Sequence, residues 1–123
     1  MFSNCNTITV SASDEIECTY SPKGVLTIKG TGTVKFSDIK KSTEDEVGYG
    51  VKKIIVKEGI TGIEAKCFYS AFEEVTSVEL PDTLTYLGEG AFEGCESLKE
   101  IRLSENIVEI PNRCFAYCYN LSN

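Results

Sequence analysis

Apolar residues recur at a fixed spacing over the second half of the chain. Starting from Val75, the apolar positions are Val78, Leu80, Leu84, Leu87, Ala91, Phe92, Cys95 and Leu98. The same series of offsets, started again at Leu98, falls on apolar residues as far as Leu121. Matching at so many positions indicates an internal repeat, in which one unit begins at Val75 and the next begins at Leu98.

A looser copy of the pattern precedes Val75. It begins at Val51 and has one extra residue after Phe68, so a bulge is expected there. We therefore predict three repeats, at residues 51–74, 75–97 and 98–120, followed by the start of another.

Each repeat opens with a short strand pattern, VKKIIV, VTSVEL or LKEIRL, in which alternate side chains are apolar. The rest of the unit returns the chain with roughly helical spacing. Because one coil cannot bury its apolar side alone, stacked coils should place equivalent strands side by side as a parallel sheet, about 4.8 Å apart.

The first 50 residues have a different pattern. Period-two alternation predicts strands at 6–10, 15–20, 25–29 and 34–36, with a tight turn at 21–24. We expect a small, mostly antiparallel sheet over residues 1–36, and then a polar loop at 37–50 with one helical turn around 42–46. Residues 1–50 would form a β cap on the end of the stack, in one structural unit with residues 51–123.

The segment VTSVELPDTLTYLGEGAFEGCESLKEI resembles the leucine-rich repeats of the BspA-like type, whose unit has the form LxxIxLPxxLxxIGxxAFxxCxxL. The resemblance covers residues 51–123. The third repeat departs from it, with Ser104 for the proline, Pro111 for the glycine and Cys114 for the alanine. The segment GVLTIKGTG, at 24–32, resembles the strand that precedes such repeats in many family members.

This resemblance implies an α/β repeat fold, a short right-handed leucine-rich-repeat solenoid with a parallel concave sheet behind the β cap. Members of the family are typically found on bacterial or protist cell surfaces and are implicated in adhesion to host cells and matrix proteins. The resemblance therefore implies that this protein is a non-enzymatic protein-interaction or adhesion module.

Composition narrows the partners. The formal charge of −7, without a large Lys/Arg cluster, argues against nucleic acid. Histidine is absent, which weighs against an enzyme and against most metal sites, and no cofactor is expected. The sequence contains no run of about 18 apolar residues, so membrane insertion is not expected. The start, MFSNCNTITVSASDE, lacks the pattern of a secretory signal, so localisation stays open despite the surface implied by the resemblance.

The strand residues that alternate with the core positions should stack across the concave sheet. One interpretation is a protein-contacting patch, and the other is a set of cross-strand charge pairs that compensate one another, each worth well under about 1 kcal/mol. The alternative function is a structural scaffold dimer whose exposed surface is inert and has no dedicated ligand site. The expected outward residues are Lys53, Ile55, Lys57, Ser77, Glu79, Pro81, Glu100, Arg102 and Ser104.

Six cysteines are present. Cys95 and Cys118 share one repeat position and Cys67 and Cys114 share another, which favours small core residues over catalysis or metal binding. Cys5 and Cys18 both fall in the expected cap, where a disulfide between neighbouring strands is geometrically possible. Free thiols are the alternative.

The sequence stops at Asn123, where a fourth repeat should begin. A terminal coil left uncovered exposes apolar side chains and a strand edge. We expect a homodimer in which two last repeats cover each other; the alternative is a fragment of a longer surface adhesin. The expected interface residues are Ile107, Ile110, Phe115, Tyr117, Tyr119 and Leu121.

Overall fold

The computed structural model describes residues 16–43, 50–69 and 72–121, with the side chains of 40–43 left out. The described strands form two sheets. A five-stranded sheet has the order β1-β2-β4-β6-β8, and a three-stranded sheet has the order β3-β5-β7. The elements are β1 (Ile16–Tyr20), β2 (Val25–Gly30), β3 (Gly32–Val34), α1 (Phe36–Thr43), β4 (Lys53–Val56), β5 (Ile60–Ile63), β6 (Ser77–Glu79), β7 (Tyr86–Leu87) and β8 (Glu100–Arg102).

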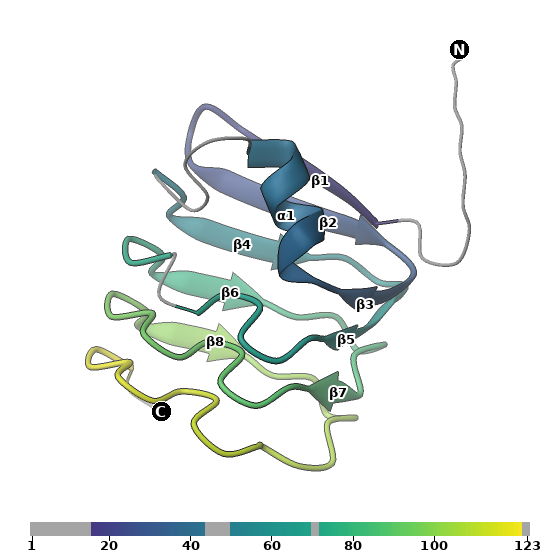
Figure 1. The fold of residues 1–123 in the computed structure, drawn as a ribbon, viewed down its shortest axis with the longest axis vertical. Coiled ribbons are helices and arrows are strands. Elements are labelled where there is room, and N and C mark those ends of the chain that lie inside the picture. The colour runs from purple at the N-terminus through teal and green to yellow at the C-terminus, as the bar shows by residue number, and fades with distance from the viewer. Residues whose placement is uncertain (1–15, 44–49, 70–71, 122–123) are drawn as a thin grey trace.

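Successive coils of the chain lie one beside the next along the long axis of the molecule (Figure 1). Each coil contributes one strand to the larger sheet. Ile54 pairs with Val78 and Val78 with Ile101, all in parallel, and these residues occupy the equivalent position of successive repeats. The spacing found in the sequence is therefore the spacing of the paired strands.

The core lies between the two sheets and follows the repeat positions. Phe68, Phe92 and Phe115 stack in successive coils, with ring centroids 5.1 and 5.7 Å apart. The expected bulge after Phe68 falls on residues 70–71, which lie outside the described residues. The apolar positions expected in the first two repeats are buried: Val51, Ile54, Val56, Ile60, Ile63, Cys67, Phe68, Phe72, Val75, Val78, Leu80, Leu84, Leu87, Ala91, Phe92, Cys95 and Leu98.

The N-terminal strands are more closely joined to the repeats than expected. β1 and β2 are antiparallel, as predicted, but β2 pairs in parallel with β4, and β3 pairs in parallel with β5. The prediction of a mostly antiparallel cap is therefore wrong for β2 and β3. The physical reason is that Leu26 and Ile28, both fully buried, have the same alternation as Ile54 and Val56 and share their core. The expected strand at 6–10 lies outside the described residues.

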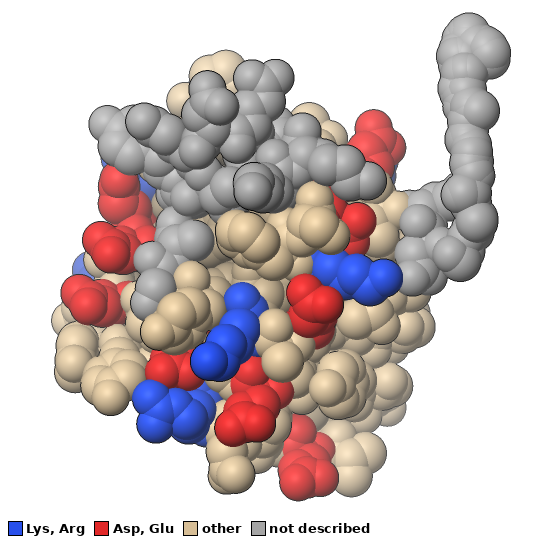
Figure 2. Space-filling view, viewed as in Figure 1, with Lys and Arg blue, Asp and Glu red and all other residues tan. Residues whose placement is uncertain are grey.

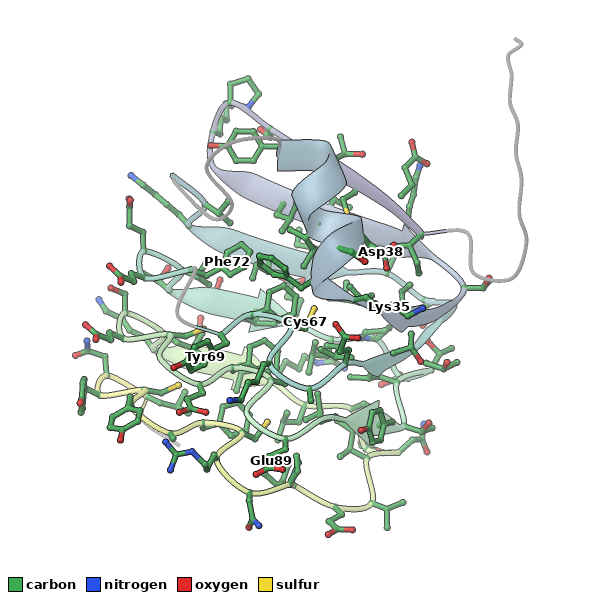
Figure 3. All side chains as sticks on the ribbon, in the orientation of Figure 1. Lys35, Asp38, Cys67, Tyr69, Phe72 and Glu89 are labelled. Carbon is green, nitrogen blue, oxygen red and sulfur yellow. The ribbon has the colours of Figure 1, made fainter. Side chains whose placement is uncertain are left out.

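The strand predicted at 34–36 lies two residues earlier, as β3, and helix α1 begins at Phe36 and takes up the first part of the loop predicted at 37–50. Its start is fixed by Asp38, whose carboxylate accepts a hydrogen bond from the backbone N–H of Lys35 at 3.0 Å. Phe36 N–H donates to the carboxylate of Glu64 at 3.1 Å, which attaches the helix to the first repeat. Ile39 is fully buried, so one side of α1 covers the core (Figures 1 and 3).

Among the described residues, none of the helical segments combines the length and the apolar character needed to cross a membrane.

Candidate binding surface

The outward side chains of the larger sheet lie in two rows across its parallel strands. Lys53, Ser77 and Glu100 occupy paired positions on β4, β6 and β8. Ile55, Glu79 and Arg102 form the second row two residues further along. Neighbouring strands in a sheet are about 4.8 Å apart, so these residues of three repeats share one small surface.

The charges on this surface are only partly compensated. Lys53 Nζ lies 3.0 Å from a carboxylate oxygen of Glu79, and both side chains are about half exposed. Glu100 and Arg102 are exposed and take part in no ion pair with another described residue. An exposed pair is worth little, and cross-strand compensation therefore accounts for Lys53 and Glu79 but leaves one carboxylate and one guanidinium unpaired.

The surface is slightly hollowed. A shallow cavity of about 310 Å³ is lined by side chains of both rows together with the strand residues beneath them. Its volume lies at the lower end of the range found for ligand pockets, and its shape is open. The lining residues are Lys53, Ser77, Val78, Glu79, Glu100, Ile101 and Arg102.

Two of the residues predicted to face outward are buried instead. Ser104 is 5% exposed; its hydroxyl lies 3.3 Å from the Asp82 carbonyl and accepts a hydrogen bond from the Asn106 N–H at 3.0 Å. Pro81, at the same repeat position, is also buried. The alternation fails there because β6 ends at Glu79 and β8 ends at Arg102. Lys57 lies one residue beyond β4 and remains exposed.

The sequence interpretation missed two residues on the same face. Val25 pairs with Lys53 and Thr27 with Ile55, so β2 extends both rows by one strand. Next to them, Lys29 and Glu17 form a looser ion pair at 3.8 Å between β2 and β1. The signal was present, since Leu26 and Ile28 repeat the spacing of the inward strand residues. The same alternation also suits a strand of the predicted β cap.

The thiols of the repeats are core groups. Cys95 Sγ lies 3.6 Å from the Phe68 carbonyl, and Cys118 Sγ lies 3.2 Å from the Phe92 carbonyl, which is the equivalent contact one coil further on. Burial raises the pKa of Cys95 to about 12 and that of Cys114 to about 11, and it raises the pKa of Cys67 further (Figure 3). Because the thiolate is the nucleophile, these cysteines are poorly suited to covalent chemistry.

We predict that the folded protein protects these thiols from alkylation. At pH 8 a pKa of about 12 makes the thiolate fraction of Cys95 more than about a thousandfold smaller than in an unfolded chain near pKa 8.5. Iodoacetamide labelling followed by peptide mass mapping should therefore show Cys67 and Cys95 reacting at least about a hundredfold more slowly than in denatured protein. Cys118, which is only half-buried, provides the internal control and should react faster than either. Equal rates at Cys95 and Cys118 would contradict the assignment.

The same burial has a pH consequence. A thiol whose pKa is raised in the folded state stabilises that state below its ordinary pKa, and this contribution is lost as the pH rises through the folded value. Stability against urea should therefore fall as the pH is raised from about 9 toward 12.

The disulfide expected between Cys5 and Cys18 stays a prediction, because Cys5 lies outside the described residues. In the part of the chain that the structure describes, no three His, Cys, Asp or Glu side chains are grouped to hold a metal ion. Acidic and basic side chains are interspersed over the face seen in Figure 2.

A buried carboxylate in the second repeat was not anticipated. Glu93 is 4% exposed and accepts a hydrogen bond from the Arg113 guanidinium at 2.7 Å, which lowers its pKa. Gly90 makes room for it, since a Cβ there would lie 2.9 Å from Glu93 Oε1. The pair joins the second repeat to the third. No periodic signal marks it, because the repeat pattern describes apolar positions only.

The residues expected at a dimer interface lie in the last repeat, 98–120, and at Leu121, which opens the next. Tyr119 is 71% exposed, Tyr117 52% and Ile110 47%. Ile107, Phe115 and Leu121 are partly buried and pack against the edge of the core. The last repeat is thus less well covered than the two before it.

Parallel strands that recur once in every repeat, paired through Ile54, Val78 and Ile101, define a leucine-rich-repeat-like fold. Comparison with known families matches residues 46–123 to the BspA type leucine rich repeat region (6 copies). The chain belongs to this family. The family is associated in general with protein–protein interaction or adhesion and is typically non-enzymatic.

Two solved structures have a similar fold. A leucine-rich repeat protein from Eubacterium ventriosum has a TM-score of 0.65 at 24% identity, over 83% of this chain and 33% of that one. A leucine rich cell surface protein from Faecalibacterium prausnitzii has a TM-score of 0.59 at 26% identity, over 94% of this chain and 28% of that one. The chain spans about a third of the length of either protein. Comparison with curated proteins found no match.

Proposed function

We propose that the protein is a non-enzymatic interaction or adhesion module that binds another protein through the outward face of β2, β4, β6 and β8. The observation that supports this most directly is the hollow of about 310 Å³ on that face, with Glu100 and Arg102 exposed beside it and unpaired among the described residues. A partner carrying the opposite charges would be steered to this surface and held in one orientation.

The family and one similar structure support a proposal for the class of partner. The Faecalibacterium prausnitzii protein is described as a leucine rich cell surface protein. We infer that this chain acts at a cell surface as part of a right-handed solenoid, and that its partner is a host-cell or extracellular-matrix protein. A standard interface needs about 800 Å² from each partner, more than three short strands provide, so β2 and the adjoining loops would contribute.

The test compares two double variants with the same net charge as the native chain. Glu100→Ser with Arg102→Ser removes the two charges of the face that form no ion pair with another described residue, and Lys23→Ser with Glu105→Ser removes two exposed charges in turns. Biolayer interferometry against a panel of purified extracellular-matrix proteins should show affinity at least about tenfold weaker for the first variant alone. Equal affinity of both variants would instead favour a scaffold whose sheet face has no ligand.

We also propose that a second copy of the chain covers the last repeat. The support is the gathering of exposed apolar side chains there, with Tyr119 71% and Ile110 47% exposed. Sedimentation velocity at micromolar concentration should give twice the mass of one chain, 13.5 kDa, for the native protein. Tyr119→Ser with Ile110→Ser should give the single-chain mass, while Tyr69→Ser, an exposed tyrosine elsewhere, should not. A native protein that sediments as a monomer would overturn this proposal and favour a following repeat as the cover.

A further inference from the structure

The smaller sheet stops at β7 although the chain continues through a third repeat. Glu64 N–H donates to the Val34 carbonyl at 2.9 Å, and Gly88 N–H donates to the Ile63 carbonyl at 2.8 Å. These bonds join one coil to the next at the same repeat position. The third repeat has Pro111 there. Proline has no N–H, so the Leu87 carbonyl cannot receive the equivalent bond.

In the described part of the chain, a second hydrogen bond that joins successive coils is also missing between the second and third repeats. The Thr61 carbonyl accepts the Thr85 N–H at 3.0 Å and lies 3.3 Å from the Thr85 hydroxyl. The equivalent residue of the third repeat is Val108, which has no hydroxyl and is 92% exposed. Within the described residues its N–H makes no bond to the Thr85 carbonyl. The edge of β7 therefore presents two backbone acceptors that the third repeat does not use.

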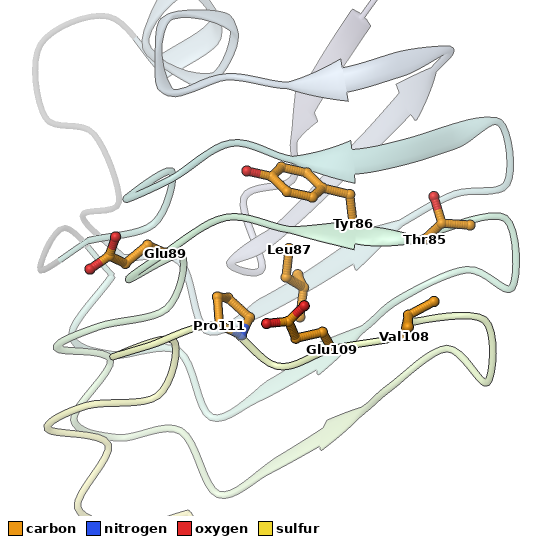
Figure 4. Close-up of a pocket in the computed structure, with 7 residues that line it drawn as sticks. All are labelled: Thr85, Tyr86, Leu87, Glu89, Val108, Glu109 and Pro111. Atoms are coloured by element: carbon orange, nitrogen blue, oxygen red, sulfur yellow. The ribbon is translucent and has the colours of Figure 1, made fainter.

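A groove of about 410 Å³ lies between this edge and the segment 108–111 (Figure 4). Its lining combines apolar groups with two exposed carboxylates, Glu89 and Glu109, neither of which is in an ion pair with another described residue. The Tyr86 side chain is 54% exposed beside it. The volume is within the range of ligand pockets. The lining residues are Thr85, Tyr86, Leu87, Glu89, Val108, Glu109 and Pro111.

We propose that this groove binds an extended, basic peptide segment of a partner protein, which adds a strand beside β7. The groove offers hydrogen-bond acceptors and negative charge, in the form of carbonyl oxygens and carboxylates. Its occupant must therefore supply hydrogen-bond donors and positive charge. An extended backbone brings N–H groups to a strand edge, and a Lys or Arg side chain complements Glu89 and Glu109. The Tyr86 ring can contact the same cation.

The groove is separate from the sheet face proposed above for the main partner, since no lining residue is shared between the two. The net charge of −7 adds to the attraction for a basic segment. A second copy of this chain is a weaker fit, because the chain is acidic. The protein would thus hold two different segments at once.

The probe is the peptide Ac-TVKVTVKV-NH2, added to ¹⁵N-labelled protein of the full chain. Backbone amide shifts should change at Tyr86, Leu87 and Val108, and the same peptide with glutamate in place of lysine should not bind. A third peptide, N-methylated at alternate positions, has the same charge but lacks the N–H groups for strand pairing. It should bind at least about tenfold more weakly if the backbone bonds are made.

Two matched variants test the charges. Glu89→Gln with Glu109→Gln should weaken binding at least about tenfold, whereas Glu73→Gln with Glu74→Gln, an exposed acidic pair elsewhere, should leave it unchanged. The amide spectrum of each variant checks that it is folded.

Four outcomes would overturn the proposal: absence of binding at millimolar peptide, equal binding of the N-methylated peptide, equal loss in both variants, or shift changes confined to the face of β4, β6 and β8. Shifts at the groove that depend on protein concentration without peptide would assign it to a second copy instead. None of these results bears on the matrix-protein assay, so the two proposals fail independently.

Discussion

Phe92→Ala should lower the free energy of unfolding by about 3–5 kcal/mol, measured by urea denaturation followed by circular dichroism. The ring is fully buried and is stacked between Phe68 at 5.1 Å and Phe115 at 5.7 Å, in the coils before and after it. Its removal leaves a cavity in a column of stacked rings that links all three repeats, and neighbouring coils held by backbone hydrogen bonds cannot collapse into that space.

The matched control is Phe115→Ala, at the same position of the third repeat. Phe115 is only partly buried and has a stacked neighbour on one side, so its loss should be clearly smaller. Equal costs at the two positions would mean that the third repeat is covered as well as the second. A cost below about 1 kcal/mol at Phe92 would contradict its place in the core.

Gly88→Ala should destabilise the protein by at least about 3 kcal/mol, at or beyond the upper end of the usual overpacking cost. A Cβ at this position would lie 2.2 Å from the Ala65 nitrogen and 2.5 Å from its Cα. Both are backbone atoms of the preceding coil, so relief requires the two coils to separate. Separation would lengthen the hydrogen bond from Gly88 N–H to the Ile63 carbonyl, now 2.8 Å.

Gly62→Ala is the control for this substitution. A Cβ there meets the Thr33 hydroxyl at 3.0 Å and the Tyr86 ring at 3.3 Å, which are side-chain atoms that can shift. Thermal unfolding of the two variants should therefore show a much larger loss at Gly88. A Gly88→Ala protein with native stability would contradict the close packing of the first and second repeats.

The repeat spacing predicted the core well because burial follows from periodicity alone. Every coil presents equivalent apolar positions to the same interior, so residues such as Leu84 and Phe92 could be placed without knowledge of the loops. The family and the parallel pairing followed from the same pattern. Their confirmation rests on the matched repeat region and on the strand registers.

Three features required the structure. Helix α1 arises in a polar segment, where a cap at Asp38 and a contact with Glu64 fix it and no apolar period marks it. Ser104 was misplaced because strand length, and not only alternation, decides which residues face outward. The partner strand of β2 could not be assigned, since the alternation of Leu26 and Ile28 suits either an antiparallel cap or a parallel addition to the repeats.

The candidate surface was found in part. Lys53, Ser77, Glu79, Glu100 and Arg102 lie together as predicted from the alternation, but their role in binding stays a proposal. The groove at β7 could not be derived from the sequence alone. The sequence shows Pro111 as a departure from the repeat. The structure adds that Glu64 and Gly88, at the equivalent positions, donate hydrogen bonds to the preceding coil that a proline cannot make.

The central claim is that this leucine-rich repeat chain recognises a protein through the face of β2, β4, β6 and β8. The most direct measurement is the affinity for immobilised extracellular-matrix proteins of the native chain, of Glu100→Ser with Arg102→Ser, and of Lys23→Ser with Glu105→Ser. The account predicts binding that weakens at least about tenfold in the first variant and stays native in the second. Failure of the native chain to bind any protein of the panel, or native affinity in both variants, would contradict it.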